Sequence, residues 1–296
     1  MKIKKSKGNI IFDVCNYVFM IILIILTLYP IWYVLIASLS DGSKFLQHTG
    51  LLLKPAGFSV ASYKLMVKNP MILIGYKNTL FILLVGLAGN ILFTSLLAYG
   101  LSRKDLYWGN IIFKLIVFTM YFSGGLIPFY LTVSKMYHLD NSYMAIIFPA
   151  LINTYNMIIM RTAFMSIPES LTEAATIDGA SHWRILFNIV FPLSMPTIAV
   201  ITLYYSVEHW NSWFNASIFL HDRNKFPLQL VLREILIIND TTTMVSGTSS
   251  NSSDAMSIGE TVKYAVIVTA TFPILCMYPF IQKYFVNGIM IGAVKG

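Results

Sequence analysis

The chain has 296 residues, of which 56% are hydrophobic and only 11% are charged, with a mean hydropathy of +0.69. Because soluble domains average about 25% charged residues, this chain cannot cover a globule with polar surface, and lipid must solvate much of it. The net charge of +8 does not indicate nucleic acid, since Lys and Arg fall mostly between apolar runs and flank them. Cys15 and Cys276 each lie within an apolar run, so neither a disulfide framework nor a metal site is predicted.

A transmembrane helix needs about 20 mostly apolar residues. The first apolar run is too long for the core of a signal peptide, which takes about 7–15 residues, so we expect a retained helix. An even number of crossings places both termini on the same side. The apolar runs predict six crossings in a single membrane domain covering 1–296, with spans at about 10–39, 75–101, 107–133, 143–165, 186–220 and 264–285.

The orientation depends on the start of the chain, because a raw count of Lys and Arg, the first lysines included, is equal on the two sides. The chain opens with a cluster of lysines: Lys2, Lys4, Lys5 and Lys7. Since the first helix usually dominates, this cluster predicts that both termini are cytoplasmic. The segment 41–70 would then be an external loop, 103–105 a tight internal turn, and 222–260 a polar external loop.

The segment at 167–191, between the fourth and fifth runs, should be a short loop but has the composition of a helix. Pro168 suits a first helical position, and acidic residues follow in the first turns, where the helix dipole favours them. Ala174 and Ala175 are strong helix formers, and Gly179 permits an abrupt end. Two interpretations stay open: a docking surface whose small residues let a partner approach, or an interfacial helix that caps the bundle.

The same segment resembles the EAA signature of ABC importer permeases, which reads Glu-Ala-Ala, three residues, Gly, nine residues, Ile, any residue, Leu, Pro. The matching residues are Glu173, Ala174, Ala175, Gly179, Ile189 and Pro192. Phe191 departs from the pattern, since Leu is usual there, but it keeps an apolar side chain. Further stretches resemble the carbohydrate-uptake branch of this family, the group of the maltose-type second permease: 124–128, 159–161, 177–180, 210–213 and 292–296. Within that branch, the chain is most similar to Gram-positive permeases for complex saccharides.

The resemblance implies an all-α membrane protein with the type I ABC importer transmembrane domain. A short cytoplasmic coupling helix at about 168–182, between spans 4 and 5, would dock into a groove of an ATPase subunit. Arg161 and Arg184 would hold this segment to the helix ends, and the tail at 287–296 would reach toward the ATPase dimer, with a frayed terminus as the alternative. The implied coupling contacts are Glu173, Ala174, Ala175, Asp178 and Gly179.

The resemblance also implies the partners. A second homologous permease, two ATPase subunits and an extracellular solute-binding lipoprotein would complete an importer of a sugar or oligosaccharide in a bacterial plasma membrane. ATP and Mg would be bound by the ATPase subunits, because this chain has no G-x-x-x-x-G-K-[ST] phosphate loop. The histidines are scattered without an i,i+4 pair, so we expect no catalytic residue, cofactor or metal here. The sequence identifies neither the saccharide nor the sister permease.

Polar side chains inside apolar spans are costly and usually face a cavity or a partner. Carboxylates and amides bond sugar hydroxyls, and indole rings stack on sugar faces, so a polar and aromatic cluster is a candidate substrate pathway. The densest cluster, in the fifth run, comprises Glu208, His209, Trp210, Asn211, Trp213 and Asn215. Two alternatives stay open: the tryptophans could be interfacial anchors, and Glu208 could pair with the sister subunit.

The fourth run offers a second candidate set, Asn153, Tyr155 and Asn156, whereas Asn78 and Asn90 suit contacts between helices. Two rival functions also remain. A secondary transporter would need coupling-ion groups and inverted repeats. An enzyme acting on lipid-linked sugars would need a convergent acid–base site. The sequence presents neither, since Glu208 and His209 are adjacent on a helix and point apart.

Overall fold

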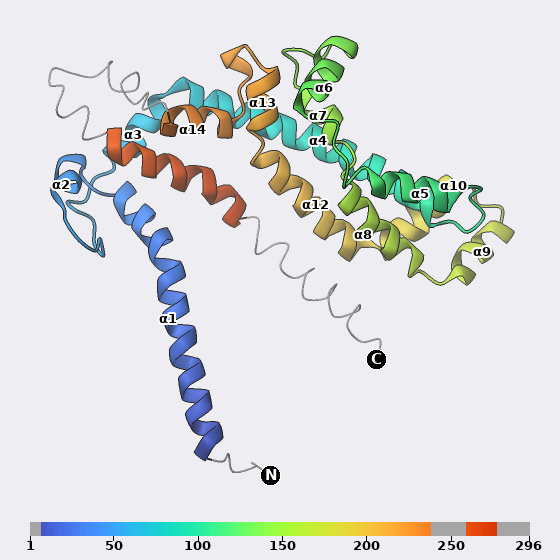
Figure 1. Cartoon of the computed structure of the whole chain (residues 1–296), viewed down its shortest axis with the longest axis horizontal. Helices are drawn as coiled ribbons and strands as arrows, with labels where there is room; N and C mark the ends of the chain where they lie inside the picture. The colour runs from blue at the N-terminus through green and yellow to red at the C-terminus, as the bar shows by residue number, and fades with distance from the viewer. Residues whose placement is uncertain (1–6, 238–258, 277–296) are drawn as a thin grey trace. The chain divides into compact units, whose positions relative to one another are not determined.

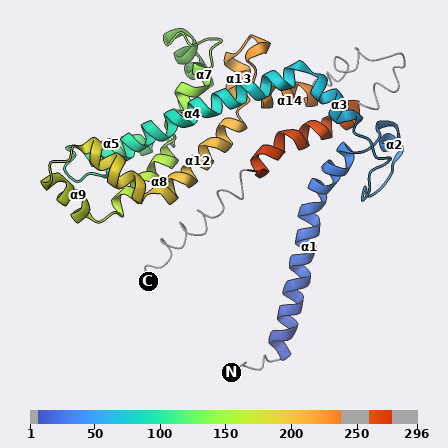
Figure 2. The same cartoon turned by 180° about the vertical axis from the view of Figure 1, so that it is seen from behind.

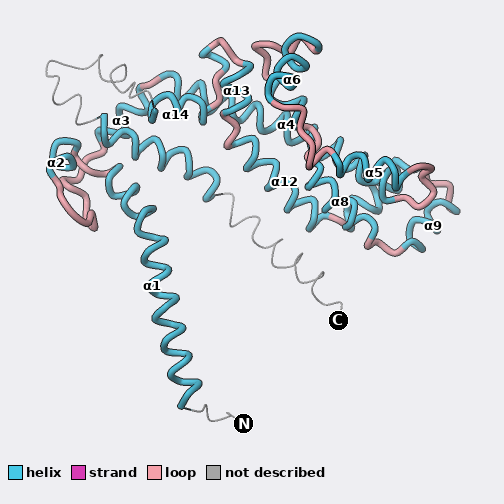
Figure 3. Tube along the Cα trace, in the orientation of Figure 1, coloured by secondary structure: helices cyan, strands magenta, loops and turns pink. Residues whose placement is uncertain are grey.

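In the computed structural model, residues 7–237 and 259–276 are described, and every named element among them is a helix (Figures 1 and 3). In chain order these elements are α1 (Lys7–Ser38), α2 (Gly42–Gln47), α3 (Ala61–Lys68), α4 (Pro70–Ser102), α5 (Gly109–Phe118), α6 (Leu126–Leu131), η1 (Thr132–Met136), α7 (Met144–Ile147), η2 (Phe148–Ala150), α8 (Thr154–Met165), α9 (Glu169–Ile177), α10 (His182–Ile185), η3 (Leu186–Val190), α11 (Phe191–Leu193), α12 (Met195–Trp210), α13 (Phe214–Phe219), η4 (Arg223–Lys225) and α14 (Leu228–Ile237). A further helix occupies 259–276.

Two helices, α1 and α4, are each long and apolar enough to cross a membrane. Two pairs of consecutive helices, each bent at a short break, are also long and apolar enough to cross a membrane when each pair is taken as one broken span. Met144–Ala150 meets Thr154–Met165 at 44°, and His182–Leu193 meets Met195–Trp210 at 86°. The described residues therefore hold two to four candidate spans, and the count of six crossings stays a prediction.

The expected third span differs from the observed helices, and the sixth lies only partly within the described residues. The run at 107–133 is not one continuous helix, because α5 ends at Phe118 and α6 begins at Leu126. Gly125, directly before α6, has a φ of +86°, a left-handed conformation that interrupts helix and that glycine adopts without strain. The sixth predicted span, 264–285, and the tail at 287–296 lie partly or wholly outside the described residues.

The chain divides into two compact units. The first comprises Met1–Pro70 and Leu232–Thr271, and the second comprises Met71–Val231 and Phe272–Gly296. In the first unit, the ring of Tyr264 packs edge to face with those of Tyr33 and Phe45, and these two are tilted against each other, with centroids 5.4 to 6.3 Å apart. Ser62 and Thr261 share a buried hydrogen bond of 2.7 Å, so residues far apart in sequence form one local core.

The second unit is built on α4, α8 and α12, which run alongside one another in both views (Figures 1 and 2). Its core consists of side chains from these helices and from η3, including Ala98, Met157, Phe164 and Tyr205, all fully buried. Asn78 in α4 donates to the carbonyls of Asn224 and Phe226 at 2.8 and 3.0 Å. Asn224 lies in η4, and Asn90 in α4 bonds His209 in α12 at 2.6 Å, so the prediction that Asn78 and Asn90 make contacts between helices is confirmed.

Candidate functional site

The segment between α8 and α12 carries the predicted coupling helix, which is α9. Pro168 is its N-cap, with φ −54° and ψ 128°, so the helix begins at Glu169, one residue later than predicted. Proline still suits this boundary because it has no N–H to leave unpaired at a helix start. Glu169 lies in the first turn, where the partial positive charge of the helix N-terminus favours a carboxylate.

The end of α9 is a Schellman motif centred on Gly179. Its φ is +76°, the left-handed conformation that glycine adopts without strain. The N–H of Ala180 bonds the carbonyl of Ala175 at 2.9 Å, and the N–H of Gly179 bonds the carbonyl of Thr176 at 3.0 Å. Ala175 and Ala180 both pack against the core of the second unit. The prediction that Gly179 ends the helix abruptly is confirmed.

The two faces of α9 differ in exposure. Thr172 is buried and Ala175 half-buried, so this face packs against the rest of the unit. Leu171, Ala174 and Ile177 recur every three residues and are exposed, and Ile177, which also borders the cavity described below, is 86% exposed. Of the predicted coupling contacts, Glu173, Ala174, Asp178 and Gly179 are exposed, and only Ala175 turns toward the core.

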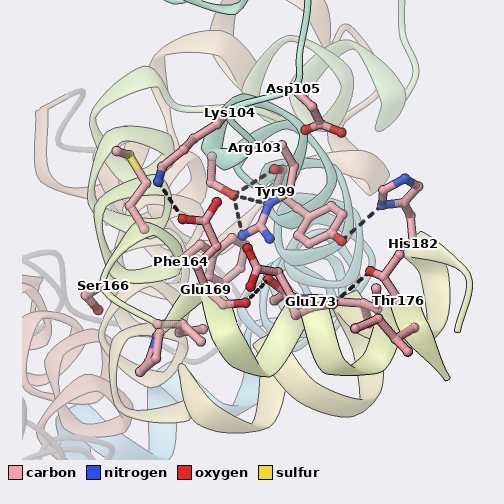
Figure 4. Close-up of a pocket in the computed structure, with 17 residues that line it drawn as sticks. Tyr99, Arg103, Lys104, Asp105, Phe164, Ser166, Glu169, Glu173, Thr176 and His182 are labelled. Atoms are coloured by element: carbon pink, nitrogen blue, oxygen red, sulfur yellow. Dashed lines mark hydrogen bonds and ion pairs between the residues drawn. The ribbon is translucent and has the colours of Figure 1, made fainter.

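A cavity of about 760 Å³ separates α9 from the turn that follows α4 (Figure 4). Glu169, Glu173 and Thr176 line it from α9, and Arg103 and Lys104 line it from the turn. The Nζ of Lys104 donates to Glu169 Oε2 at 2.5 Å. This hydrogen bond, together with the charges of Glu169 and Glu173, raises the pKa of Lys104 above its usual 10.5. The turn thus contacts the first turn of α9.

Other contacts tie both sides of α9 to α4. Arg161 donates from Nε to the carbonyl of Leu101 at 2.9 Å, and its guanidinium lies over the Phe113 ring. The hydroxyl of Tyr99 bonds Nδ1 of His182 at 3.4 Å. Arg184 is exposed, and its backbone N–H bonds Ser181 Oγ at the start of α10. The roles of Lys104 and Tyr99 were missed, although the charged residues of the turn at 103–105 were a signal.

The candidate pathway residues of the fifth run separate into two groups. Glu208, Asn211 and Trp213 line a cavity of about 190 Å³, together with Asn215 and Ala150. His209 also touches this cavity, but its ring is 97% buried and bonds Asn90. Trp210 is buried and packs against Tyr76, with ring centroids 6.1 Å apart.

The second candidate set lies beside this cavity. The Asn153 side chain caps α8 by accepting the N–H groups of Tyr155 and Asn156, and it also interacts with the Glu208 carboxylate. Asn156 is buried, whereas Tyr155 is exposed. The structure therefore brings together Glu208, Asn211, Trp213 and Asn153, a set of polar and aromatic groups suited to hydroxyl-rich ligands.

The comparisons with known proteins decide the family. The model of the family described as "Binding-protein-dependent transport system inner membrane component" matches residues 4–291. The chain belongs to this family. As a binding-protein-dependent permease it is the non-catalytic, multi-pass membrane subunit of an ABC importer, which confirms the assignment made from the EAA signature. Membership also sets aside the secondary-transporter and enzyme hypotheses.

Two Bacillus subtilis relatives are similar over nearly their full lengths. The polygalacturonan/rhamnogalacturonan transport system permease protein YtcP is 40% identical over 288 residues, which cover 97% of this chain and 99% of that protein. The protein LplC is 38% identical over 291 residues, 98% and 97% of the two chains. A chain in the crystal structure of a bacterial ABC transporter involved in the import of the acidic polysaccharide alginate is 30% identical, with a TM-score of 0.86 over 96% of this permease and 100% of that chain.

Proposed function

We propose that this permease imports an oligosaccharide, and that acidic sugars are the first class to test. The polysaccharides named for YtcP and for the alginate importer support this substrate class. The small cavity lined by Glu208, Asn211 and Trp213 offers hydrogen-bonding and stacking groups for a sugar. An acidic sugar would meet Glu208 unfavourably unless a cation or a shared proton lay between the two carboxyl groups, so neutral sugars belong in the same assay.

In the proposed assembly, the chain forms one membrane domain with six crossings and both termini in the cytoplasm. A second permease pairs with it, two ATPase subunits lie below, and a solute-binding protein delivers the saccharide from outside. α9 is the coupling helix. Closure of the ATPase dimer on ATP would displace α9 and rock the membrane subunits between inward-facing and outward-facing states.

The exposed apolar face of α9 is the observation that carries this proposal. Leu171 and Ile177 are 45% and 86% exposed on a helix whose other face is packed, and nothing within the described residues covers them. Exposed apolar side chains on a short, rigidly capped helix favour a partner surface. Ala174 lies between them and lets that surface approach closely. Glu173 and Asp178 lie at the edges of the face, where a cationic partner side chain would be favoured.

Co-purification tests the proposal. The chain is expressed with its sister permease and ATPase, purified in nanodiscs, and assayed for bound ATPase and for ATP hydrolysis. We expect Ile177→Glu to release the ATPase, because it places a charge in the docking face. Thr176→Glu is the matched control, since it adds the same charge one residue away on the same cavity wall, where Ile177 also lies, without removing an apolar side chain. A wild-type chain that never retains an ATPase would contradict the proposal.

A further inference from the structure

The bend in the fourth span leaves backbone polar groups that need partners. Met144–Ala150 and Thr154–Met165 meet at 44°, and at this break the carbonyls of Ala150 and Leu151 and the N–H of Asn153 are bonded by side chains of other helices. Unpaired backbone groups at membrane depth cost several kcal/mol each, so such a break persists only where other groups satisfy them. Side chains from α4 and α12 supply those partners here.

Asn90 in α4 satisfies the carbonyl side of the break. Its Nδ2 donates to the carbonyls of Ala150 and Leu151 at 2.5 and 3.0 Å. With both amide hydrogens used, its Oδ1 must act as an acceptor, and Nε2 of His209 donates to it at 2.6 Å. Asn90 is fully buried. Gly86 leaves room for the imidazole, because a Cβ there would lie 2.6 Å from Nε2 of His209.

Tyr205 in α12 satisfies the N–H side of the break. Its hydroxyl accepts the N–H of Asn153 at 2.9 Å and shares a 2.8 Å hydrogen bond with Thr94 in α4. Asn153 in turn caps α8, and its side chain interacts with Glu208. The first turn of α8 is therefore bonded to α12 beside the small cavity that Glu208 lines.

We infer that Asn90, Tyr205 and His209 form a clamp that makes α8 and α12 move as one body during transport. The chain order explains why this matters: α8 immediately precedes α9, and α12 follows it through α10, η3 and α11. The cavity is lined by Ala150, just before α8, and by Glu208 in α12, so it keeps its shape during a displacement of α9 only if both helices move together. The inference rests on the proposed coupling role of α9 and assigns the three residues positioning roles.

Four variants in the reconstituted complex test the clamp. His209→Leu removes the donor to Asn90, whereas His209→Gln keeps an amide donor at about the reach of Nε2. Tyr205→Phe removes one hydroxyl and no ring volume. Ser95→Ala is the matched control, because Ser95 is buried in α4 but bonds the sulfur of Met160, away from the break. The readout is the ratio of saccharide imported to ATP hydrolysed in proteoliposomes.

We expect His209→Leu and Tyr205→Phe to lower this ratio about fivefold or more, as for the loss of a coupling free energy of typical size. His209→Gln should restore it and Ser95→Ala should leave it unchanged. A purely structural role would instead lower assembly and leave the ratio of assembled complexes intact. Spin labels at Thr162 in α8 and Tyr204 in α12, both exposed, should give a narrow distance distribution in wild type and a broad one in Tyr205→Phe.

The outcomes separate the two proposals. If wild type retains no ATPase, the coupling role of α9 fails and the clamp fails with it. If wild type couples and Tyr205→Phe keeps a normal ratio and a narrow distance distribution, only the clamp is overturned. If His209→Leu does not assemble, Tyr205→Phe decides, since it is the smaller change.

Discussion

Ala175 and Gly179 are two parts of one structural motif: the carbonyl of Ala175 is capped by the chain that turns back through the left-handed Gly179. The four-residue spacing between them is therefore required by the end of α9 itself. The alanine methyl packs on the core, where a longer side chain would push the helix outward. This part of the EAA pattern has a reason in the fold that is independent of any partner.

Replacement of Gly179 tests that reason. We expect Gly179→Ala to destabilise the end of α9 by about 1–2 kcal/mol through backbone strain alone, since no atom lies within 4 Å of the new Cβ. Amide hydrogen exchange across 169–182 should become about 5- to 30-fold faster. Gly179→Asn, which tolerates the left-handed conformation better, should have the smaller effect. Equal exchange in wild type and Gly179→Ala would argue against the motif.

The ion pair of Lys104 and Glu169 positions the start of α9. Both side chains are exposed, so we expect reversal of either charge to leave stability nearly unchanged and to weaken ATPase coupling. The double swap, Lys104→Glu with Glu169→Lys, should recover much of the coupling. ATP hydrolysis and transport are measured together for the four combinations. Recovery no better than in either single variant would show that the pair does not act through its charges.

The same pair predicts a pH dependence. Because the bond to Glu169 raises the pKa of Lys104 above 10.5, its contribution is fully present below the ordinary lysine pKa and is lost as pH rises through the raised value. Coupling profiles of wild type and Lys104→Met should therefore run parallel between about pH 6 and 9. Convergence of the two profiles within that window would place the proton on another group.

Asn78 should be a strong determinant of stability. Its amide donates to two carbonyls and its Oδ1 accepts from the hydroxyl of Tyr143 at 2.9 Å. Asn78→Leu leaves these groups unpaired and should cost about 1–3 kcal/mol or more, measured by thermal unfolding in detergent. Tyr143→Phe should cost less, about 1 kcal/mol. Leu80→Ala, on an exposed part of α4, is the control and should have the smallest effect.

The small cavity predicts a kinetic signature. Glu208→Gln and Asn211→Ala should raise the KM for the saccharide by about tenfold each while ATPase retention stays normal, since each removes one polar contact to substrate. Tyr204→Phe, on α12 but outside the cavity lining, should leave the KM unchanged. A normal KM in both cavity variants would move the pathway elsewhere.

The apolar runs of the sequence predicted the helices well where one run corresponds to one continuous helix. The run at 75–101 corresponds to α4, Pro70–Ser102, because no proline interrupts the helix after its first residue. The apolar runs did not predict the bends after Ala150 and at Ser194, since apolarity reports burial in lipid and carries no information on backbone direction. Asn153, an N-cap residue inside the fourth run, was the local signal for the first of these bends.

The candidate site was predicted unevenly for a similar reason. α9 was predicted because its cap residues and alanines are contiguous in sequence. The partners of α9 in the turn after α4 were missed, because a contact between residues 65 positions apart leaves no local pattern. His209 and Glu208 were grouped by adjacency, yet His209 is buried and bonds Asn90 of α4, whereas Glu208 lines the cavity without being fully buried. Helical periodicity predicted that the two side chains point apart, but it did not predict which of them faces the cavity.

The exposed apolar surface of α1 has a consequence for how the helix is inserted into the membrane. Its most apolar window has a mean hydropathy of 2.5 and is only 6% buried, and its contacts within the described residues concentrate at its C-terminal end, near Ile36 and Ala37. Partitioning of this apolar surface into lipid thus supplies free energy for placing the helix that does not depend on packing within the described part of its own unit. α1 can enter the bilayer as soon as it leaves the ribosome, before the helices that surround the clamp have been synthesised.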